Sequence, residues 1–132
     1  MNLAQLPAST ACFWTKSFNN SSGYDTFALC IDPTGASVYD CELPSGSSVV
    51  ETGPSVTPGT WHHLALSWDG SNKHNYFDGV SVGGGSHAIG SGNQGMALGA
   101  SRGAYYVDGV LDDAIYYTRA LSAAEIAQLA AP

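Results

Sequence analysis

Three carboxylates lie close together near the C-terminal end of the sequence, at Asp108, Asp112 and Asp113. Enzymes that hydrolyse glycosidic bonds use two carboxylic acids, one as proton donor and the other as nucleophile or base. Asp108 and Asp112 would share one face of an extended strand only if Gly109 did not interrupt the alternation of side chains. No glutamate accompanies these residues, so we expect them to serve the fold rather than catalysis.

Two further patterns that could do chemistry fail on geometry. His62 and His63 are adjacent, and adjacent side chains of a strand point to opposite faces, so they cannot share a metal ion. We expect backbone or aromatic neighbours to satisfy the hydrogen-bonding groups of both histidines.

Residues 90–95 match the G-x-G-x-x-G pattern. A dinucleotide site needs a helix directly afterwards, whereas residues 96–99 have the composition of a strand. The sequence also lacks a G-x-S-x-G turn at a strand-to-helix elbow, and it predicts that the protein is not an enzyme.

Aromatic and polar residues in the later loops could bind a carbohydrate. Sugars are held by aromatic rings together with polar groups on a sheet or on its rim loops. The candidate ligand-binding residues are Tyr105, Tyr106, Arg102 and Asn93. The alternative, in which exposed tyrosines only cover the end of the core, stays open.

The charge of the chain excludes other classes of ligand. The formal net charge is −7, with only four Lys and Arg residues, and these are scattered along the sequence. Nucleic acids are gripped by clustered cations, so we expect no nucleic-acid partner, and the same charge argues against anionic membrane surfaces. No apolar run approaches the length of a membrane-spanning helix, and residues 1–7 lack the charged and apolar regions of a signal peptide.

Three cysteines, Cys12, Cys30 and Cys41, show neither a C-x-x-C pair nor the spacing of a zinc site. The odd count leaves at least one free thiol. All three lie in apolar, strand-like runs, where cysteine behaves as a small buried hydrophobic residue. We expect that role for them, with a disulfide or a reactive thiol as the alternative.

Composition and patterning indicate an all-β domain with one short helix. The sixteen glycines and many aromatic residues are typical of short strands joined by tight turns. Strands are expected at residues 10–16, 24–32, 36–42, 48–51, 60–69, 73–77, 95–101 and 105–117. The strand at residues 60–69 carries apolar groups on both faces, so we expect it to lie in the centre of a sheet.

The strongest turn signal is the Asp-Gly pair at residues 78–79. Asp-Gly between two strand-like runs favours a two-residue hairpin, because both central residues must adopt positive φ. This hairpin would pair Phe77 with Val80 and Tyr76 with Ser81.

The end of the chain changes to a helical pattern. Ser122 and Glu125 have the spacing of a capping box, and Leu121 and Ile126 are placed as a hydrophobic staple. One short C-terminal helix should pack onto the sandwich through a stripe that contains Ile126, Leu129 and Ala130.

Three segments in the same order resemble the laminin-G-like, concanavalin A-like lectin jelly roll of the pentraxin-like superfamily. Residues 60–70 (TWHHLALSWDG) are similar to its "tWhHvAl…DG" strand and turn, and residues 75–80 (NYFDGV) to its "lYlDGk" hairpin. Residues 109–126 (GVLDDAIYYTRALSAAEI) resemble its "G-x-I-D-E-V-x-I-Y-N-R-A-L-S-x-x-E-I" ending almost position for position. Residues 10–16 (TACFWTK) are also similar to its early "a-W-v-K" strand, and together these segments cover most of the chain.

The resemblance implies a two-sheet antiparallel jelly-roll sandwich that forms a single domain over residues 1–132. The family usually begins with another strand, which has no counterpart in the short leader before Thr10. Because sheets avoid bare edges, we expect a neighbouring copy or a rerouted N-terminus to fill that place. The first possibility predicts a homo-oligomer.

The resemblance also implies a calcium site at the rim of the sandwich, to which Asp112 would contribute a ligand. Calcium prefers the oxygen ligands that carboxylates and carbonyls provide. The family's N-terminal partner residues are missing, so the alternative without calcium stays open.

We therefore expect a non-catalytic binding module, carbohydrate-binding or adhesive, that acts at the cell surface or outside the cell as the family resemblance suggests. The alternative is a structural or protein-interaction module that assembles through an open sheet edge and binds no sugar.

Overall fold

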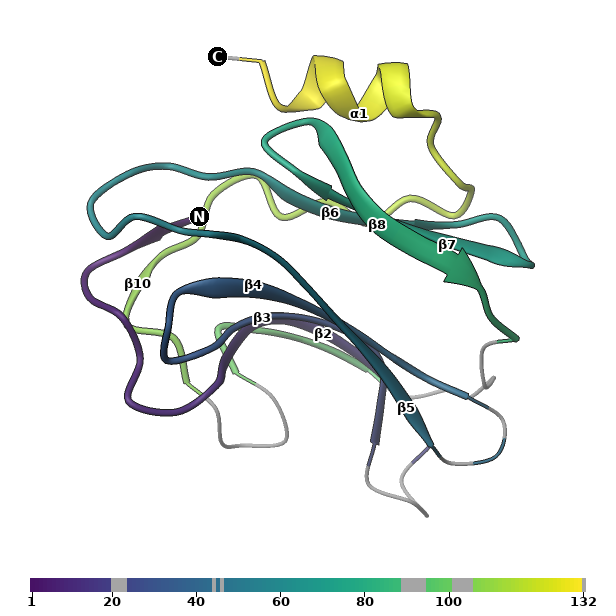
Figure 1. Ribbon diagram of the computed structural model, residues 1–132, viewed down its shortest axis with the longest axis horizontal. Coiled ribbons are helices and arrows are strands. Elements are labelled where there is room, and N and C mark those ends of the chain that lie inside the picture. Colours follow the sequence, from purple (N-terminus) through teal and green to yellow (C-terminus); the bar gives the residue numbers. More distant parts are fainter. Residues whose placement is uncertain (20–23, 44, 46, 89–94, 101–105, 132) are drawn as a thin grey trace.

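The computed structural model describes residues 1–19, 24–43, 45, 47–88, 95–100 and 106–131, and it shows a sandwich of two antiparallel layers (Figure 1). The lower layer in that view is a curved five-stranded sheet, and the upper layer is a three-stranded sheet. The expected all-β sandwich is thereby confirmed.

The five-stranded sheet has the order β5-β4-β3-β2-β9. Its strands are β2 (Ala11–Asn19), β3 (Tyr24–Ile31), β4 (Ala36–Glu42), β5 (Ser48–Ser55) and β9 (Met96–Leu98). The turn between β3 and β4 is held by Asp32, whose carboxylate accepts hydrogen bonds from the backbone N–H groups of Thr34 and Ala36. Gly35 follows at a φ of 87°, a conformation that glycine adopts without steric cost.

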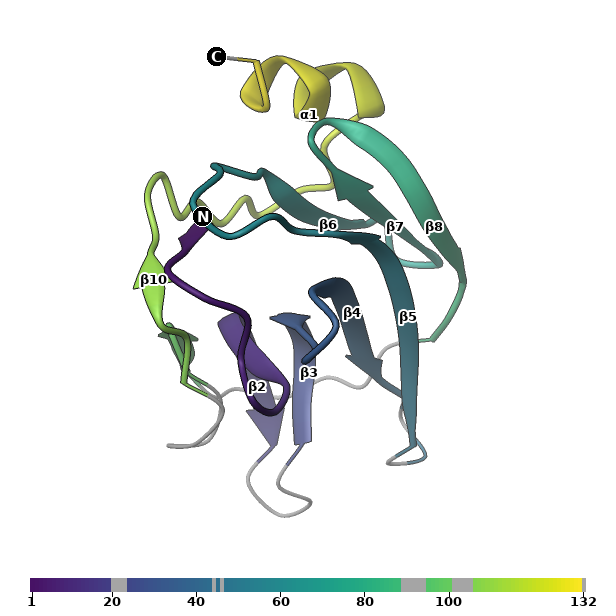
Figure 2. The ribbon, with the colours of Figure 1, turned by 60° about the vertical axis from the view of Figure 1, so that its left-hand side comes forward.

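The three-stranded sheet has the order β6-β7-β8, formed by β6 (Leu64–Trp68), β7 (Asn72–Phe77) and β8 (Val80–Ser86). Helix α1 (Ala123–Leu129) covers the outer side of this sheet, away from the five-stranded layer (Figure 2). A third, two-stranded sheet joins the N-terminal β1 (Asn2–Leu3) to β10 (Gly109–Val110) at one end of the sandwich.

The main core lies between the two layers. Its buried members come from strands far apart in the sequence and are Leu3, Phe13, Leu29, Ile31, Tyr39, Val56 and Phe77. Leu29 and Ile31 alternate onto the inner face of β3, as the period of two requires. A smaller cluster of Cys12, Ala28, Cys30 and Val38 lies on the opposite face of the same strands.

The Asp-Gly hairpin is confirmed. Asp78 and Gly79 have φ values of 48° and 78°, as a type I′ turn needs. The register pairs Phe77 with Val80 and Tyr76 with Ser81.

The capping box is confirmed as well. The Ser122 hydroxyl accepts from the Glu125 N–H at 3.3 Å, and the Glu125 carboxylate accepts from the Ser122 N–H at 2.8 Å. Ile126 is buried against the sheet, but Leu129 is 44% exposed. The expected apolar stripe is therefore wrong at Leu129, because the short helix contacts the sheet along only part of that stripe.

Two strand predictions need correction. The strand expected at residues 60–69 begins only at Leu64 and lies at an edge of its sheet, not in the centre. The strand expected at residues 105–117 is reduced to Gly109–Val110 within the described residues. Asp113 has a φ of 48°, and a left-handed residue breaks the extended path that strand pairing needs.

The leader before Thr10 contributes the short strand β1, in which Asn2 pairs with Val110 and Leu3 with Gly109. The N-terminus of the chain thus supplies a strand next to β10. Gly109 allows this close approach, since a Cβ atom there would lie 3.0 Å from the Cα atom of Leu3.

The cysteine prediction is wrong for two of the three residues. Cys12 and Cys30 lie directly opposite each other on β2 and β3 and form a disulfide. Hydrophobic patterning shows that both are buried but does not show the register that brings them together. Cys41 is a buried free thiol, as expected, and burial raises its pKa above the ordinary value.

Candidate binding groove

A large groove opens along the free edge of β6. Its volume is about 1220 Å³, somewhat above the usual range of small-molecule sites. One wall is β6 with the residues before it, and the other wall is the segment of residues 111–121, which leads from β10 to α1. The floor is formed by side chains of β2, β3 and β9: Phe13, Trp14, Phe27, Leu29 and Leu98.

Aromatic rings line the groove from both walls. Tyr116 stacks on Trp14 with ring centroids 6.3 Å apart and an angle of 13° between the planes. Half of the Tyr116 side chain is exposed, as is 53% of Trp61 on the facing wall. Further in, Trp68 packs against Phe27. Exposed rings that are held in place by packing are suited to stack on the apolar face of a sugar.

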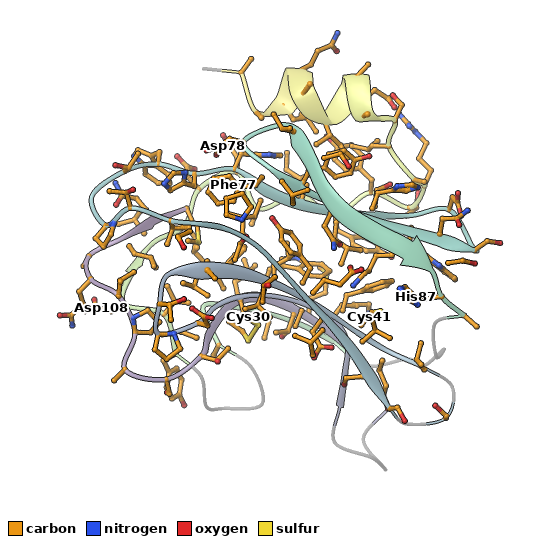
Figure 3. The ribbon with its side chains drawn as sticks, in the orientation of Figure 1. Cys30, Cys41, Phe77, Asp78, His87 and Asp108 are labelled. Atoms are coloured by element: carbon orange, nitrogen blue, oxygen red, sulfur yellow. A yellow bond between two sulfur atoms is a disulfide. The ribbon has the colours of Figure 1, made fainter. Side chains whose placement is uncertain are left out.

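A polar network lies at one end of the groove, where β7 ends at Phe77 and the turn residue Asp78 follows (Figure 3). The Asp78 carboxylate contacts His62 Nδ1 at 2.9 Å and accepts from the backbone N–H of His63 at 2.8 Å. His62 Nε2 accepts from the backbone N–H of Thr57 at 3.1 Å. Because Nε2 is an acceptor, Nδ1 carries the proton of the neutral ring and donates it to Asp78.

This network fixes the ring of His62, which also packs on Phe77 with centroids 4.9 Å apart. The expectation that neighbours satisfy the histidines is thus confirmed for His62. Nδ1 of His63 has no hydrogen-bond partner in the part of the chain that the structure describes. Burial lowers the pKa of His63, which favours its neutral form.

Three more carboxylates line the groove, at Asp69, Asp112 and Asp113. Asp69 accepts hydrogen bonds from the backbone N–H groups of Asn72 and Ser71, and these lower its pKa. Asp112 accepts from the N–H of Asp113 at 2.9 Å. All three are exposed, so their remaining lone pairs can accept hydrogen bonds from the hydroxyl groups of a ligand.

The far end of the groove is closed by an ion pair. Arg119 donates to both carboxylate oxygens of Glu125, at 3.2 and 2.6 Å. The hydrogen bond from Arg119, together with those from Ser122, lowers the pKa of Glu125 to about 2. Ser67 Oγ donates to the carbonyl of Leu121 at 3.1 Å, and this contact ties the end of the wall to β6.

The structure places only part of the predicted site in this groove. Tyr106 is 67% exposed and is not among the residues that line it, while Tyr105, Arg102 and Asn93 lie outside the described residues. Asp112 lines the groove, but no group of three His, Cys, Asp or Glu side chains that could hold a metal ion exists among the described residues. The calcium site at Asp112 stays a prediction.

Asp108 is separated from the other carboxylates of its cluster. It lies at the periphery of the molecule (Figure 3), where it accepts from Gln5 Nε2 at 3.0 Å. Unlike Asp112, it does not line the groove.

Sequence reasoning missed the aromatic residues of the groove, above all Trp61 and Tyr116. Both lie in runs that the sequence predicts as regular strands, at residues 60–69 and 105–117. The signal that could have identified Tyr116 is the pair of adjacent aspartates before it, because aspartate is unfavourable inside strands and tolerates positive φ.

Comparison with known proteins agrees with this architecture. A family model described as the concanavalin A-like lectin/glucanases superfamily matches residues 1–127. No curated protein sequence matches the chain.

Several solved structures share the fold. A native heptameric SAP-like pentraxin from Limulus polyphemus superposes with a TM-score of 0.71 at 16% identity, covering 96% of this chain and 65% of the pentraxin. The Trypanosoma rangeli sialidase in complex with the inhibitor DANA superposes with a TM-score of 0.73 at 17% identity, covering 98% of this chain and 21% of the sialidase. The binding domain of Paraclostridial Mosquitocidal Protein 1 gives a TM-score of 0.56 at 16% identity, covering 92% of this chain and 36% of that one.

The chain therefore spans about two thirds of the pentraxin and about a fifth of the sialidase. At these identities the likeness concerns the fold alone. Within the described residues, no helix is long and apolar enough to cross a bilayer.

Proposed function

The chain belongs to the concanavalin A-like lectin/glucanase superfamily, and from that premise we propose that it is a non-catalytic module that binds carbohydrate in the groove beside β6. The observation that carries the proposal is the combination of exposed, fixed aromatic rings with exposed carboxylates around one cavity of about 1220 Å³. Rings stack on the apolar faces of sugars, and carboxylates accept hydrogen bonds from their hydroxyl groups.

The electrostatics of the groove favour a neutral sugar. Asp69, Asp78, Asp112 and Asp113 line it, whereas its one cationic side chain among the described lining residues, Arg119, is paired with Glu125. The Met1 ammonium offsets part of the charge of Asp78 and Asp112, but an acidic sugar would still meet an excess of like charge, which costs free energy in a partly enclosed site. We therefore expect neutral oligosaccharides to bind in preference to sialylated or sulfated ones.

Non-catalytic binding is supported by the separation of the carboxylates. Asp108 lies at the periphery and outside the groove lining, so it does not form a catalytic pair with Asp112 there. Asp78 is engaged by His62 and by the backbone of His63. Neither arrangement offers the acid and base that glycoside hydrolysis requires.

A glycan array followed by titration calorimetry tests the proposal. A neutral oligosaccharide should bind, and Tyr116→Ala should weaken its affinity roughly tenfold, the effect of about 1.4 kcal/mol of lost stacking. Tyr106→Ala is the matched control, because Tyr106 is equally aromatic and exposed but lies outside the groove.

The outcomes separate two sites. If Tyr106→Ala abolishes binding and Tyr116→Ala does not, the ligand binds at the predicted rim loop rather than in the groove. If no glycan binds at all, the carbohydrate-binding function is refuted.

An extracellular or cell-surface location is part of the proposal. The Cys12–Cys30 disulfide supports it, because disulfides persist in oxidising compartments outside the cytosol.

A second function, assembly through a sheet edge, is supported by β9. This short strand lies at the edge of the five-stranded sheet and exposes 53% of Met96 and 55% of Leu98. Exposed apolar side chains on an open edge can pair with a second copy. Light scattering that shows an oligomer, together with its dissociation in Met96→Lys, which lies outside the groove lining, would support this function; a monomer at every concentration would exclude it.

A further inference from the structure

Two polar side chains are buried between the layers, and a third, partly exposed one reaches them from β5. Lys73 is 0% exposed and Asn75 is 1% exposed. They alternate onto the same inner face of β7. Glu51 reaches them from β5: its Oε2 atom lies 2.9 Å from Lys73 Nζ and 2.5 Å from Asn75 Nδ2.

This cluster is unusual for the interior of a sandwich. Lysine is almost never fully buried unless it is paired. Burial of a charge is costly because the charge loses its hydration, and a partner offsets only part of that cost. Lys73 also donates to the carbonyl of Tyr39 at 3.2 Å and hydrogen-bonds the thiol of Cys41. Asn75 Oδ1 is buried without a hydrogen-bond partner in the described part of the chain. An amine and a carboxamide are thus buried beside a partly exposed carboxylate, and the carboxamide oxygen has hydrogen-bonding capacity unused.

We propose that Lys73 and Asn75 form an intramolecular amide cross-link, with Glu51 as the group that transfers the protons. The amine is the nucleophile, the carboxamide is the electrophile, and one carboxylate oxygen contacts both nitrogen atoms. Because the two residues share one face of β7, the reaction needs side-chain rotation but no change in the strand.

The reaction balances without any co-reactant. The Lys73 ammonium gives a proton to Glu51, and the neutral amine attacks Cγ of Asn75, so that a new C–N bond forms. The C–Nδ2 bond then breaks, and the leaving NH2 group receives the two protons that Lys73 loses, one directly and one through Glu51, which returns to its carboxylate form. Ammonium departs, and a Lys–Asn amide remains; nothing is oxidised or reduced.

The surroundings support these roles. Burial raises the pKa of Glu51, but the hydrogen bonds from Lys73 and Asn75 outweigh it and leave the pKa below its ordinary value. Glu51 is therefore ionised at neutral pH and can accept the proton. The neighbouring thiol of Cys41 has a pKa raised by burial and stays protonated, so it does not compete as a nucleophile. Exclusion of water from Lys73 and Asn75 also protects the acyl centre from hydrolysis.

Intact mass spectrometry of the folded, reduced chain tests the proposal. After incubation to constant mass, the protein should weigh about 17 Da less than its sequence, the mass of one ammonia. Trypsin should fail to cleave after Lys73, and fragmentation should assign the missing mass to a peptide that contains Lys73 and Asn75. A protein at its full sequence mass would overturn the inference and leave a buried ion pair.

Three variants serve as controls. Glu51→Gln keeps the shape and hydrogen bonding of the side chain but cannot accept the proton, and it should retain the full mass. Lys73→Met and Asn75→Leu remove the nucleophile and the electrophile, and both should also retain the full mass. Both place apolar side chains of similar size in the core, and circular dichroism verifies that they fold. If the loss of mass persists in Lys73→Met, it arises from another reaction, such as cyclisation of an asparagine, and the cross-link is refuted.

Discussion

The strands β2 to β4 and the segment of residues 111–121 carry similar residues but bury them very differently. Ile31 and Tyr39 on β3 and β4 are 0% exposed. Ile115 and Tyr116 in the segment are 56% and 50% exposed. The first region has a hydrogen-bonded neighbour on each side of β3, whereas the second passes along the edge of β6 without pairing to it.

This difference shows that burial depends on pairing as well as on residue type. A strand that is held on both sides presents every second side chain to the opposite sheet. A segment that is interrupted by a left-handed residue such as Asp113 cannot keep that alternation. Its apolar residues then remain available to a ligand, which is why the groove forms there.

The largest contrast should appear when the same truncation is made in both regions. Ile31→Ala leaves a cavity in the main core and should lower the free energy of unfolding by about 2–5 kcal/mol. Ile115→Ala removes a mostly exposed side chain and should change it by no more than about 0.5 kcal/mol. Urea denaturation of both variants measures the difference; equal losses would show that the segment is packed as tightly as β3.

Removal of the disulfide should have the next largest effect. Replacing both Cys12 and Cys30 with alanine opens a loop with a sequence separation of 18. The free energy of unfolding should fall by about 3 kcal/mol, because the unfolded chain gains conformational entropy. The thermal midpoint of the wild type should fall in a reductant, while that of the double variant should not. A reductant effect of equal size in both proteins would show that it does not arise from this disulfide.

The stack between Trp14 and Tyr116 should contribute less to the free energy of unfolding than the disulfide does. Tyr116→Ala should lower the free energy of unfolding by about 0.5–1.5 kcal/mol beyond the effect of buried area, since its ring stacks on Trp14 of β2. A double-mutant cycle with Trp14→Leu isolates the contribution of the pair. A coupling free energy near zero would mean that the ring of Tyr116 is not held in place.

The smallest effect concerns pH at the start of α1. Glu125 has its pKa lowered to about 2 by Arg119 and by Ser122, so its contribution to stability is present above the ordinary pKa of 4.5. That contribution should be lost as the pH falls from there toward 2. Amide exchange in α1 should accelerate over this interval, and Glu125→Gln should remove the dependence. A change centred near neutral pH would indicate a different group.

Much of the fold could be predicted from local patterns. The alternation in β3, the Asp-Gly hairpin and the capping box each depend on residues close together in the sequence, and each was found in the structure. The candidate site could be predicted only in part. Asp112 lies where the groove forms, but Trp14 and Tyr116 come from segments about a hundred residues apart, and no local pattern shows that they meet.

The sequence by itself determined the class of the fold, its turns and its terminal helix, because backbone sterics, periodicity and capping act over a few residues. Only the tertiary structure decided that Cys12 lies opposite Cys30, that β6 lies at an edge, and that Lys73, Asn75 and Glu51 contact one another. These facts depend on strand order and register, and contacts between distant strands set both.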